Sequence, residues 1–240
     1  MNIMKIPMNT PMKTPILMRI ALPLALALSL HAQAAKDANA TYQTAEGRKN
    51  MAKTLADVHR DARQKPAELV AALAIKPGMS VADIGTGVGY MLPFLSAAAG
   101  TGKVYSEDIF DDFLAAAKAR AEEHKLKNVT FIKGGERDPM LPENCCDLVL
   151  VLDVYHHFDY PEQMLAGLAK GIKKGGRLAI VDYYKRKGAM PGTDSSRALT
   201  HIRLDAADAA KEIETLGGFK LISVNPFLPG TQYIAMFERQ

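Results

Sequence analysis

Short apolar runs alternate with amphipathic segments along most of the chain. The run from Asp147 to Leu152 is almost continuously apolar, which is typical of a strand buried on both faces. The segment from Pro66 to Ala74 instead carries its apolar side chains at helical spacing, and its proline suits the first turn of a helix. Strand and helix patterns alternate in this way for five units, which predicts an α/β domain with a parallel sheet between two layers of helices.

The same patterns give expected bounds for the elements. The expected strands are Met79 to Ile84, Lys103 to Glu107, Val129 to Lys133, Asp147 to Leu152, Arg177 to Val181, Phe219 to Val224 and Thr231 to Phe237. The expected helices are Glu46 to His59, Pro66 to Ala74, Tyr90 to Ala99, Phe110 to His124, Pro161 to Ile172 and Ala206 to Leu216. No helix pattern separates the last two strands, so they are expected to form a hairpin with one antiparallel strand. The polar segment from Lys36 to Thr44 is expected to be loose.

The first 34 residues have the pattern of a secretory signal peptide. Lys5, Lys13 and Arg19 precede a short apolar run from Ile20 to Leu30, and the small-x-small site Ala32-Gln33-Ala34 follows it. The run is shorter than the roughly 20 residues that a membrane span needs. We therefore expect cleavage after Ala34 and an exported, periplasmic protein.

An uncleaved, membrane-anchoring signal is the alternative, because Ile16 to Met18 would lengthen the apolar run if Arg19 reached the interface. With cleavage, no stable association with a membrane is expected. The remainder divides into an N-terminal helical segment, residues 35–65, and one domain, residues 66–240.

Composition narrows the classes of partner. The formal net charge is +4, and three of the cations lie in the predicted leader, so the rest of the chain is close to +1. No basic run with interleaved aromatic residues occurs, so we expect no nucleic-acid partner. The only cysteines are the adjacent Cys145 and Cys146, which form no disulfide framework. Oligomeric state is not readable from the sequence.

A glycine loop follows the first expected strand. The loop has glycine at three alternate positions, Gly85, Gly87 and Gly89, and the first of these lies two residues after Asp83. Glycines at such positions let the backbone turn sharply and let a ligand approach closely. The dinucleotide fingerprint Gly-x-Gly-x-x-Gly would need glycine where this chain has Tyr90, which counts against a dehydrogenase.

In this context the loop resembles motif I of the class I S-adenosylmethionine (SAM)-dependent methyltransferases, and the chain as a whole resembles their small-molecule type 11 members. Matching motifs run in order from about Pro66 to Arg239. The resemblance implies a Rossmann-like three-layer sandwich whose seven-stranded sheet is mostly parallel, with an antiparallel C-terminal strand. It also implies SAM as cofactor and methyl transfer to the oxygen or nitrogen of a small-molecule acceptor. The alternative is an exported binding protein of this fold without methyl-transfer activity.

The resemblance also implies which residues bind SAM. In open α/β sheets ligands lie at the carboxyl ends of the strands, and the family places its cofactor there. The expected cofactor-binding residues are Asp83, Gly85, Thr86, Gly87, Gly89, Tyr90, Asp108, Ile109, Glu136, Asp138 and Asp153. Asp108 is preferred over Glu107 as the acceptor for the ribose hydroxyls. The choice between Glu136 and Asp138 for the adenine amino group stays open.

Candidate catalytic residues follow the fourth and fifth strands. His156 and His157 are candidates for a general base because the pKa of histidine lies near neutrality, and Tyr184 is expected to close the acceptor pocket. His201 and Arg203 are further candidates for substrate contact, and Arg60, Arg63 and Gln64 lie where a lid would sit.

We expect no metal site, because no His-x-x-x-His or Cys-x-x-Cys spacing occurs. The neighbours Asp153, His156 and His157 could bind an ion only if they converged.

Overall fold

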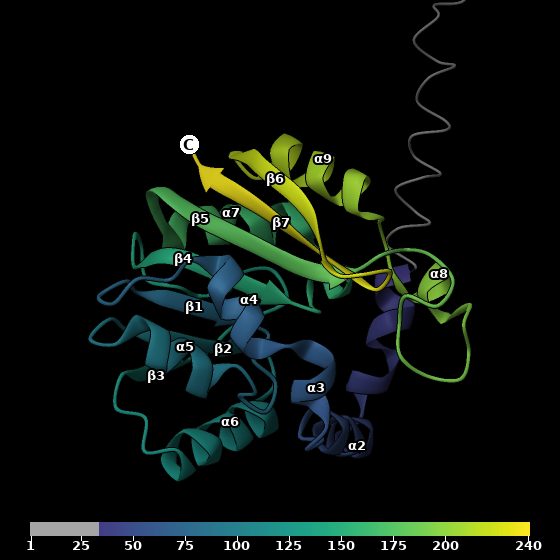
Figure 1. Ribbon diagram of the computed structural model, residues 1–240, viewed down its shortest axis with the longest axis horizontal. Helices are drawn as coiled ribbons and strands as arrows, with labels where there is room; N and C mark the ends of the chain where they lie inside the picture. The colour runs from purple at the N-terminus through teal and green to yellow at the C-terminus, as the bar shows by residue number, and fades with distance from the viewer. Residues whose placement is uncertain (1–33) are drawn as a thin grey trace, which may run out of the picture.

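Seven strands form one sheet in the order β3-β2-β1-β4-β5-β7-β6 in the computed structural model, which describes residues 34–240 (Figure 1). The strands are β1 (Val81–Ile84), β2 (Val104–Asp108), β3 (Val129–Lys133), β4 (Cys146–Leu152), β5 (Ile172–Tyr183), β6 (Phe219–Leu228) and β7 (Gln232–Arg239). The pairs β1–β2, β1–β4, β2–β3 and β4–β5 are parallel, whereas β7 runs antiparallel to β5 and β6. The predicted α/β fold with a mostly parallel seven-stranded sheet is confirmed.

Helices cover both faces of the sheet (Figure 1). They are α2 (Ala45–Leu55), α3 (Arg60–Gln64), α4 (Pro66–Leu73), α5 (Leu92–Ala99), α6 (Asp111–Glu123), α7 (Pro161–Gly171), α8 (Arg197–His201) and α9 (Ala206–Leu216). Two short 3₁₀-helices, η2 (Ala40–Gln43) and η3 (Tyr155–His157), complete the set together with a helical stretch over residues 34–39. Among residues 34–240, no helix is long and apolar enough to cross a membrane.

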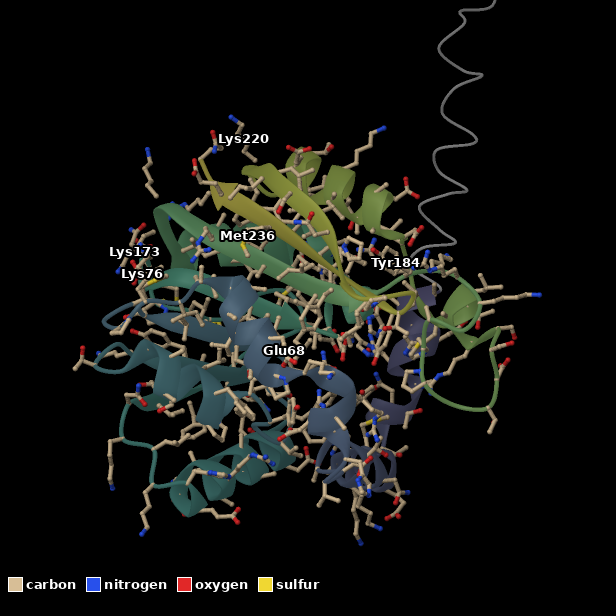
Figure 2. All side chains as sticks on the ribbon, viewed as in Figure 1. Glu68, Lys76, Lys173, Tyr184, Lys220 and Met236 are labelled. Carbon is tan, nitrogen blue, oxygen red and sulfur yellow. The ribbon has the colours of Figure 1, made fainter. Side chains whose placement is uncertain are left out.

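Alternate residues of β4 face two separate parts of the core. Leu148 and Leu150 pack with α4, α5 and α6 on one face of the sheet, while Val149 and Val151 pack with α7 and α9 on the other. This alternation explains the continuous apolar run, because both faces of the strand are removed from water. Charged side chains such as Lys76 and Lys220 lie exposed on the outside (Figure 2).

Several element bounds differ from the expected ones for local reasons. The strand β5 begins at Ile172 and not at Arg177 as expected, and its pairing with β4 shifts register between Cys146 and Leu148. The strand β6 runs through Pro226 to Leu228, which an edge strand tolerates because one side of it needs no hydrogen-bond partner.

The N-terminal region departs most from expectation. Residues 36–44 are helical up to Gln43 instead of loose, and Thr44 then caps α2 by accepting a hydrogen bond from Gly47 N (3.0 Å). Ala35 and Ala38 are buried. The predicted signal peptide lies outside the described residues except for its last residue, Ala34.

We expect Leu150→Ala to lower the free energy of unfolding by about 2–5 kcal/mol, because it leaves a cavity in a fully buried central strand. Denaturant unfolding followed by circular dichroism measures this loss. Leu216→Ala is the matched control at a side chain 39% exposed, where the change should stay near 0.5 kcal/mol. An equal loss in both variants would contradict the assignment of β4 to the centre of the core.

Candidate functional site

A cavity of about 740 Å³ opens at the carboxyl ends of the parallel strands. It is lined by residues that follow β1, β2, β4 and β5, and by residues of the N-terminal segment. The neighbours of β1 in the sheet are β2 and β4, whose connections leave to opposite sides. This is the switch point at which open α/β sheets bind their ligands.

The glycine loop after β1 borders the cavity with Gly85, Thr86 and Gly87. Gly85 and Gly87 have φ of 66° and 56°, in the left-handed region that favours glycine. A Cβ on Gly85 would lie 2.7 Å from Val154 Cγ2, so a larger residue there would push into the loop after β4. The loop is fixed by Thr86 N, which donates to Glu107 O (2.8 Å).

Two acids at the end of β2 lie beside this loop, and both line the cavity. Asp108 Oδ2 accepts from Gly87 N (2.8 Å), and its Oδ1 accepts from Phe110 N (2.9 Å). Glu107 Oε2 accepts from Gly85 N (3.2 Å), but its buried Oε1 has no partner within residues 34–240. Burial raises the pKa of Asp108 to about 6, and burial together with the Asp108 charge raises that of Glu107 well above its usual range.

Asp153 closes β4 and lines the same cavity. Its φ of 56° is unusual for a residue other than glycine. Its Oδ1 accepts from Gln232 Nε2 (2.6 Å), and Gln232 Oε1 accepts in turn from Gln64 Nε2 (2.9 Å). Burial, followed by the charge of Asp182, raises the pKa of Asp153 to about 7.

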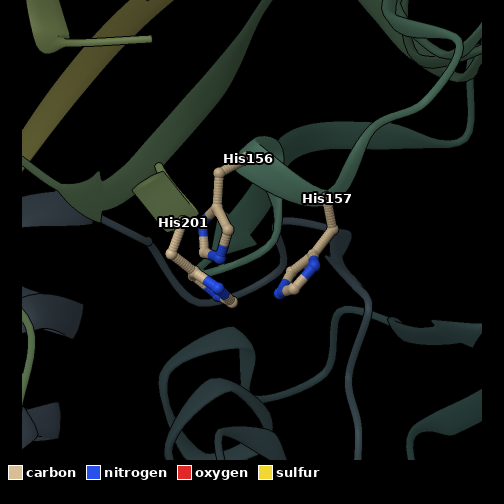
Figure 3. Close-up of side chains that lie close together, drawn as sticks. All are labelled: His156, His157 and His201. Atoms are coloured by element: carbon tan, nitrogen blue, oxygen red, sulfur yellow. The ribbon is translucent and has the colours of Figure 1, made fainter. Parts of the chain in front are cut away.

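Three histidines that line the same cavity lie close together (Figure 3). His156 Nδ1 lies 2.7 Å from Asp182 Oδ1, and both side chains are buried. His157 Nδ1 lies 2.9 Å from Asn39 Oδ1. His201, at the end of α8, completes the group, and its ring centroid lies 5.1 Å from that of His156.

Two of these rings are held in the neutral form near neutral pH. Burial lowers the pKa of His157 well below its usual range, and neighbouring His156 adds to the effect. Burial lowers the pKa of His201 to about 4. A neutral imidazole keeps one nitrogen lone pair, so these rings can accept a hydrogen bond or bind a cation.

The structure brings most of the predicted residues to one cavity. Those that line it are Gly85, Thr86, Gly87, Asp108, Ile109, Glu136, Asp153, His156 and His157. His201, Arg60, Arg63 and Gln64 line it as well.

Five residues predicted for the cofactor or for catalysis do not line the cavity, and neither does Arg203, whose guanidinium donates to Glu212 Oε2 (2.7 Å). Asp83 and Gly89 support the glycine loop: Asp83 Oδ2 accepts from Thr86 Oγ1 (2.8 Å), and a Cβ on Gly89 would lie 3.0 Å from the backbone of Ala117 on α6. The hydroxyl of Tyr90 donates to Asp61 Oδ1 (2.8 Å), which ties the loop to α3.

The other two predicted residues that do not line the cavity are Asp138 and Tyr184. Asp138 Oδ1 accepts from Met140 N (2.8 Å) within its own turn, whereas Glu136 lines the cavity. The ring of Tyr184 lies tilted beside that of Tyr233 at a centroid distance of 5.4 Å and beneath Arg186, and it is Tyr183, the last residue of β5, that lines the cavity. The position expected for Tyr184 is thus occupied by Tyr183.

Residues of the N-terminal segment are the main part of the site that the sequence did not reveal. Asn39 and Tyr42 line the cavity, and the ring of Tyr42 packs edge-on against His157 at a centroid distance of 5.2 Å. Arg197 and Gln232 line it from α8 and from the start of β7. The only sequence signal for this wall was the isolated aromatic residue Tyr42 in a polar stretch.

Comparison with known proteins agrees with this geometry. Residues 82–180 match the family model described as a methyltransferase domain. A ubiquinone/menaquinone biosynthesis C-methyltransferase, UbiE, from Burkholderia cenocepacia is 27% identical over 117 residues, 48% of either chain. The chain therefore spans about half the length of the curated relatives that it matches.

Solved structures extend the likeness over more of the chain. A SAM-dependent methyltransferase from Aquifex aeolicus is 26% identical and has a TM-score of 0.69, covering 79% of this chain and 96% of that one. One from Mesorhizobium loti shares the fold at 16% identity, with a TM-score of 0.57 and coverage of 72% and 96%. Together the comparisons show a match to a methyltransferase domain over residues 82–180 and a likeness to a solved SAM-dependent methyltransferase over 79% of the chain.

The buried carboxylates predict how stability depends on pH. The folded state raises the pKa of Asp153 from 3.8 to about 7, so it binds a proton more tightly than the unfolded chain does. The contribution of Asp153 to stability is therefore fully present below pH 3.8 and is lost as the pH rises through about 7.

We expect Asp153→Asn to be more stable than the wild type at pH 8, with the advantage disappearing toward pH 4. Denaturant unfolding at both pH values measures this, and Asp208→Asn on the exposed face of α9 is the control. A constant difference across that range would contradict the shift.

Proposed function

We propose that this chain, which carries a methyltransferase domain over residues 82–180, transfers the methyl group of SAM to an oxygen or nitrogen atom of a small-molecule acceptor. The observation that carries the proposal is one cavity bordered by a positive-φ glycine loop, two buried acids and three histidines. SAM supplies an electrophilic methyl group on a sulfonium cation. The protein then has to align the acceptor with that methyl group, remove a proton and exclude water.

The buried acids fit the cofactor side of this reaction. The unpartnered Glu107 Oε1 is a hydrogen-bonding atom inside a cavity wall, where an unsatisfied group costs about 1–3 kcal/mol unless a ligand or water meets it. Asp108 has both oxygens occupied by backbone N–H groups, yet each carboxylate oxygen has room for a further hydrogen bond. We keep Asp108 as the proposed ribose acceptor, with Glu107 as its competitor.

The histidines fit the acceptor side. Asp182 Oδ1 lies 2.7 Å from His156 Nδ1 and orients the ring so that Nδ1 carries the proton and Nε2 is free to accept one. A proton acceptor of this kind serves a hydroxyl or amine, which must lose a proton when it is methylated. We therefore propose His156 as the general base, with His157 beside it at a ring-centroid distance of 4.1 Å.

Calorimetric titration of the purified chain tests the cofactor assignment. We expect SAM and its demethylated product S-adenosylhomocysteine to bind, and NAD not to bind. Asp108→Asn should weaken SAM binding at least tenfold, because it removes a charge-assisted hydrogen bond of about 1.5–3 kcal/mol. Glu107→Gln should weaken it less, and Asp208→Asn should not change it. Weaker SAM binding by Glu107→Gln than by Asp108→Asn would instead assign the ribose contact to Glu107.

Turnover separates an enzyme from a binding protein of the same fold. Incubation with SAM and a panel of phenols, alcohols and amines should yield S-adenosylhomocysteine and a methylated product in equal amounts. We expect His156→Gln to lower the rate by 10²-fold or more while SAM affinity stays within about twofold. SAM binding without product from any acceptor would favour the non-catalytic alternative.

We also propose that the chain is exported and acts in the periplasm, on the strength of the basic, apolar and small-x-small pattern over residues 1–34. Expression of the full chain in a Gram-negative host, followed by fractionation, tests this. Mass spectrometry should find a periplasmic chain that begins at Ala35. A chain of full mass in the membrane fraction would indicate an uncleaved anchor, and one of full mass in the cytoplasm would refute export.

A further inference from the structure

The three histidines come from two segments that are distant in sequence. His156 and His157 lie on η3, directly after β4, and His201 ends α8. Each offers one ring nitrogen, and these nitrogens lie within 4.8 Å of one another. Figure 3 shows the three rings converging on a common space.

The outer nitrogens of two rings are already occupied. His156 Nδ1 is held by the buried carboxylate of Asp182 at 2.7 Å, and His157 Nδ1 by the amide oxygen of Asn39 at 2.9 Å. These bonds direct each Nε2 toward the centre of the group. Metal-binding histidines have this arrangement, in which a carboxylate or carbonyl oxygen accepts from the nitrogen that does not touch the ion.

The spacing suits a transition metal. A tetrahedral ion with Zn–N bonds of about 2.1 Å keeps its ligand nitrogens about 3.4 Å apart. Nitrogens that already lie within 4.8 Å need only small side-chain movements to reach that distance. Three imidazole ligands leave one position of a tetrahedral ion open, and all three histidines line the cavity, so that position is accessible from it.

We propose that His156, His157 and His201 form a binding site for one divalent transition-metal ion, of the class of Zn²⁺ or Co²⁺, with its open position facing the cavity. The ion occupies the nitrogen that serves as general base in the metal-free chain, so the two roles exclude each other at His156. Resting on the proposed function, the ion would recruit an acceptor through a hydroxyl, which is a ligand that such ions bind.

Cobalt titration of the full chain, after removal of metals with a chelator, tests the site without SAM or an acceptor. We expect one Co²⁺ per chain, the visible absorption bands of a four-coordinate ion, and displacement of Co²⁺ by Zn²⁺. His201→Ala should weaken Co²⁺ binding more than about 100-fold, and Asn39→Ala, which removes the partner of His157, about 10-fold. His124→Ala, at an exposed histidine on the far end of α6, is the matched control and should bind Co²⁺ like the wild type.

Each outcome of the cobalt titration either supports or overturns the metal site. Loss of binding in His201→Ala with an unchanged circular dichroism spectrum supports the site, and His201→Gln repeats the test if the alanine variant does not fold. Failure of the folded wild type to bind Co²⁺ or Zn²⁺, or full binding by both His201 variants, overturns it. SAM binding measured on the same samples reports on the proposed function independently.

Discussion

The pairing of β1 with both β2 and β4 is the constraint on which the site depends. The four residues of β1 are all buried and are hydrogen-bonded on both sides in parallel register, with Val81 opposite both Val104 and Leu148. Parallel strands in register end at the same edge of the sheet. Glu107 and Asp108 at the end of β2 and Asp153 directly after β4 are therefore brought to one edge of the sheet by the pairing of the strands.

The site concentrates groups that are unfavourable to bury. Glu107, Asp108 and Asp182 are carboxylic acids with at most 4% exposure, and Asp153 joins them in a backbone conformation that few residues other than glycine adopt. The two apolar clusters on the faces of the sheet offset this cost, because β4 and its neighbours are buried on both sides. Local strain and raised carboxylate pKa values at one edge are typical of a region shaped for a ligand rather than for stability.

The sequence allowed the sheet and the glycine loop to be predicted, because period-two and period-3.6 patterns report burial directly. The sequence was also sufficient to predict that the acids at the end of β2 and the acid and histidines after β4 lie close together. The reason is that the carboxyl ends of parallel strands meet at the same edge of the sheet. It did not reveal Asn39 and Tyr42, because a polar segment has no periodicity and its partner His157 lies 118 residues from Asn39. The proximity of His201 to His156 and His157 could not be predicted from the sequence either. The helix α8 has only five residues, and its position over the cavity depends on the tertiary fold.

The hydrogen bond between Gln64 and Gln232 spans 168 residues, and the one between Asn39 and His157 spans 118. The walls of the cavity therefore combine residues near the beginning and near the end of the described part of the chain, residues 34–240. During synthesis the pocket stays incomplete until β7 has emerged from the ribosome. A chain that ends before β7 therefore lacks part of the wall that would hold a ligand. A ligand that binds this pocket recognises the finished molecule and shifts the folding equilibrium toward it alone.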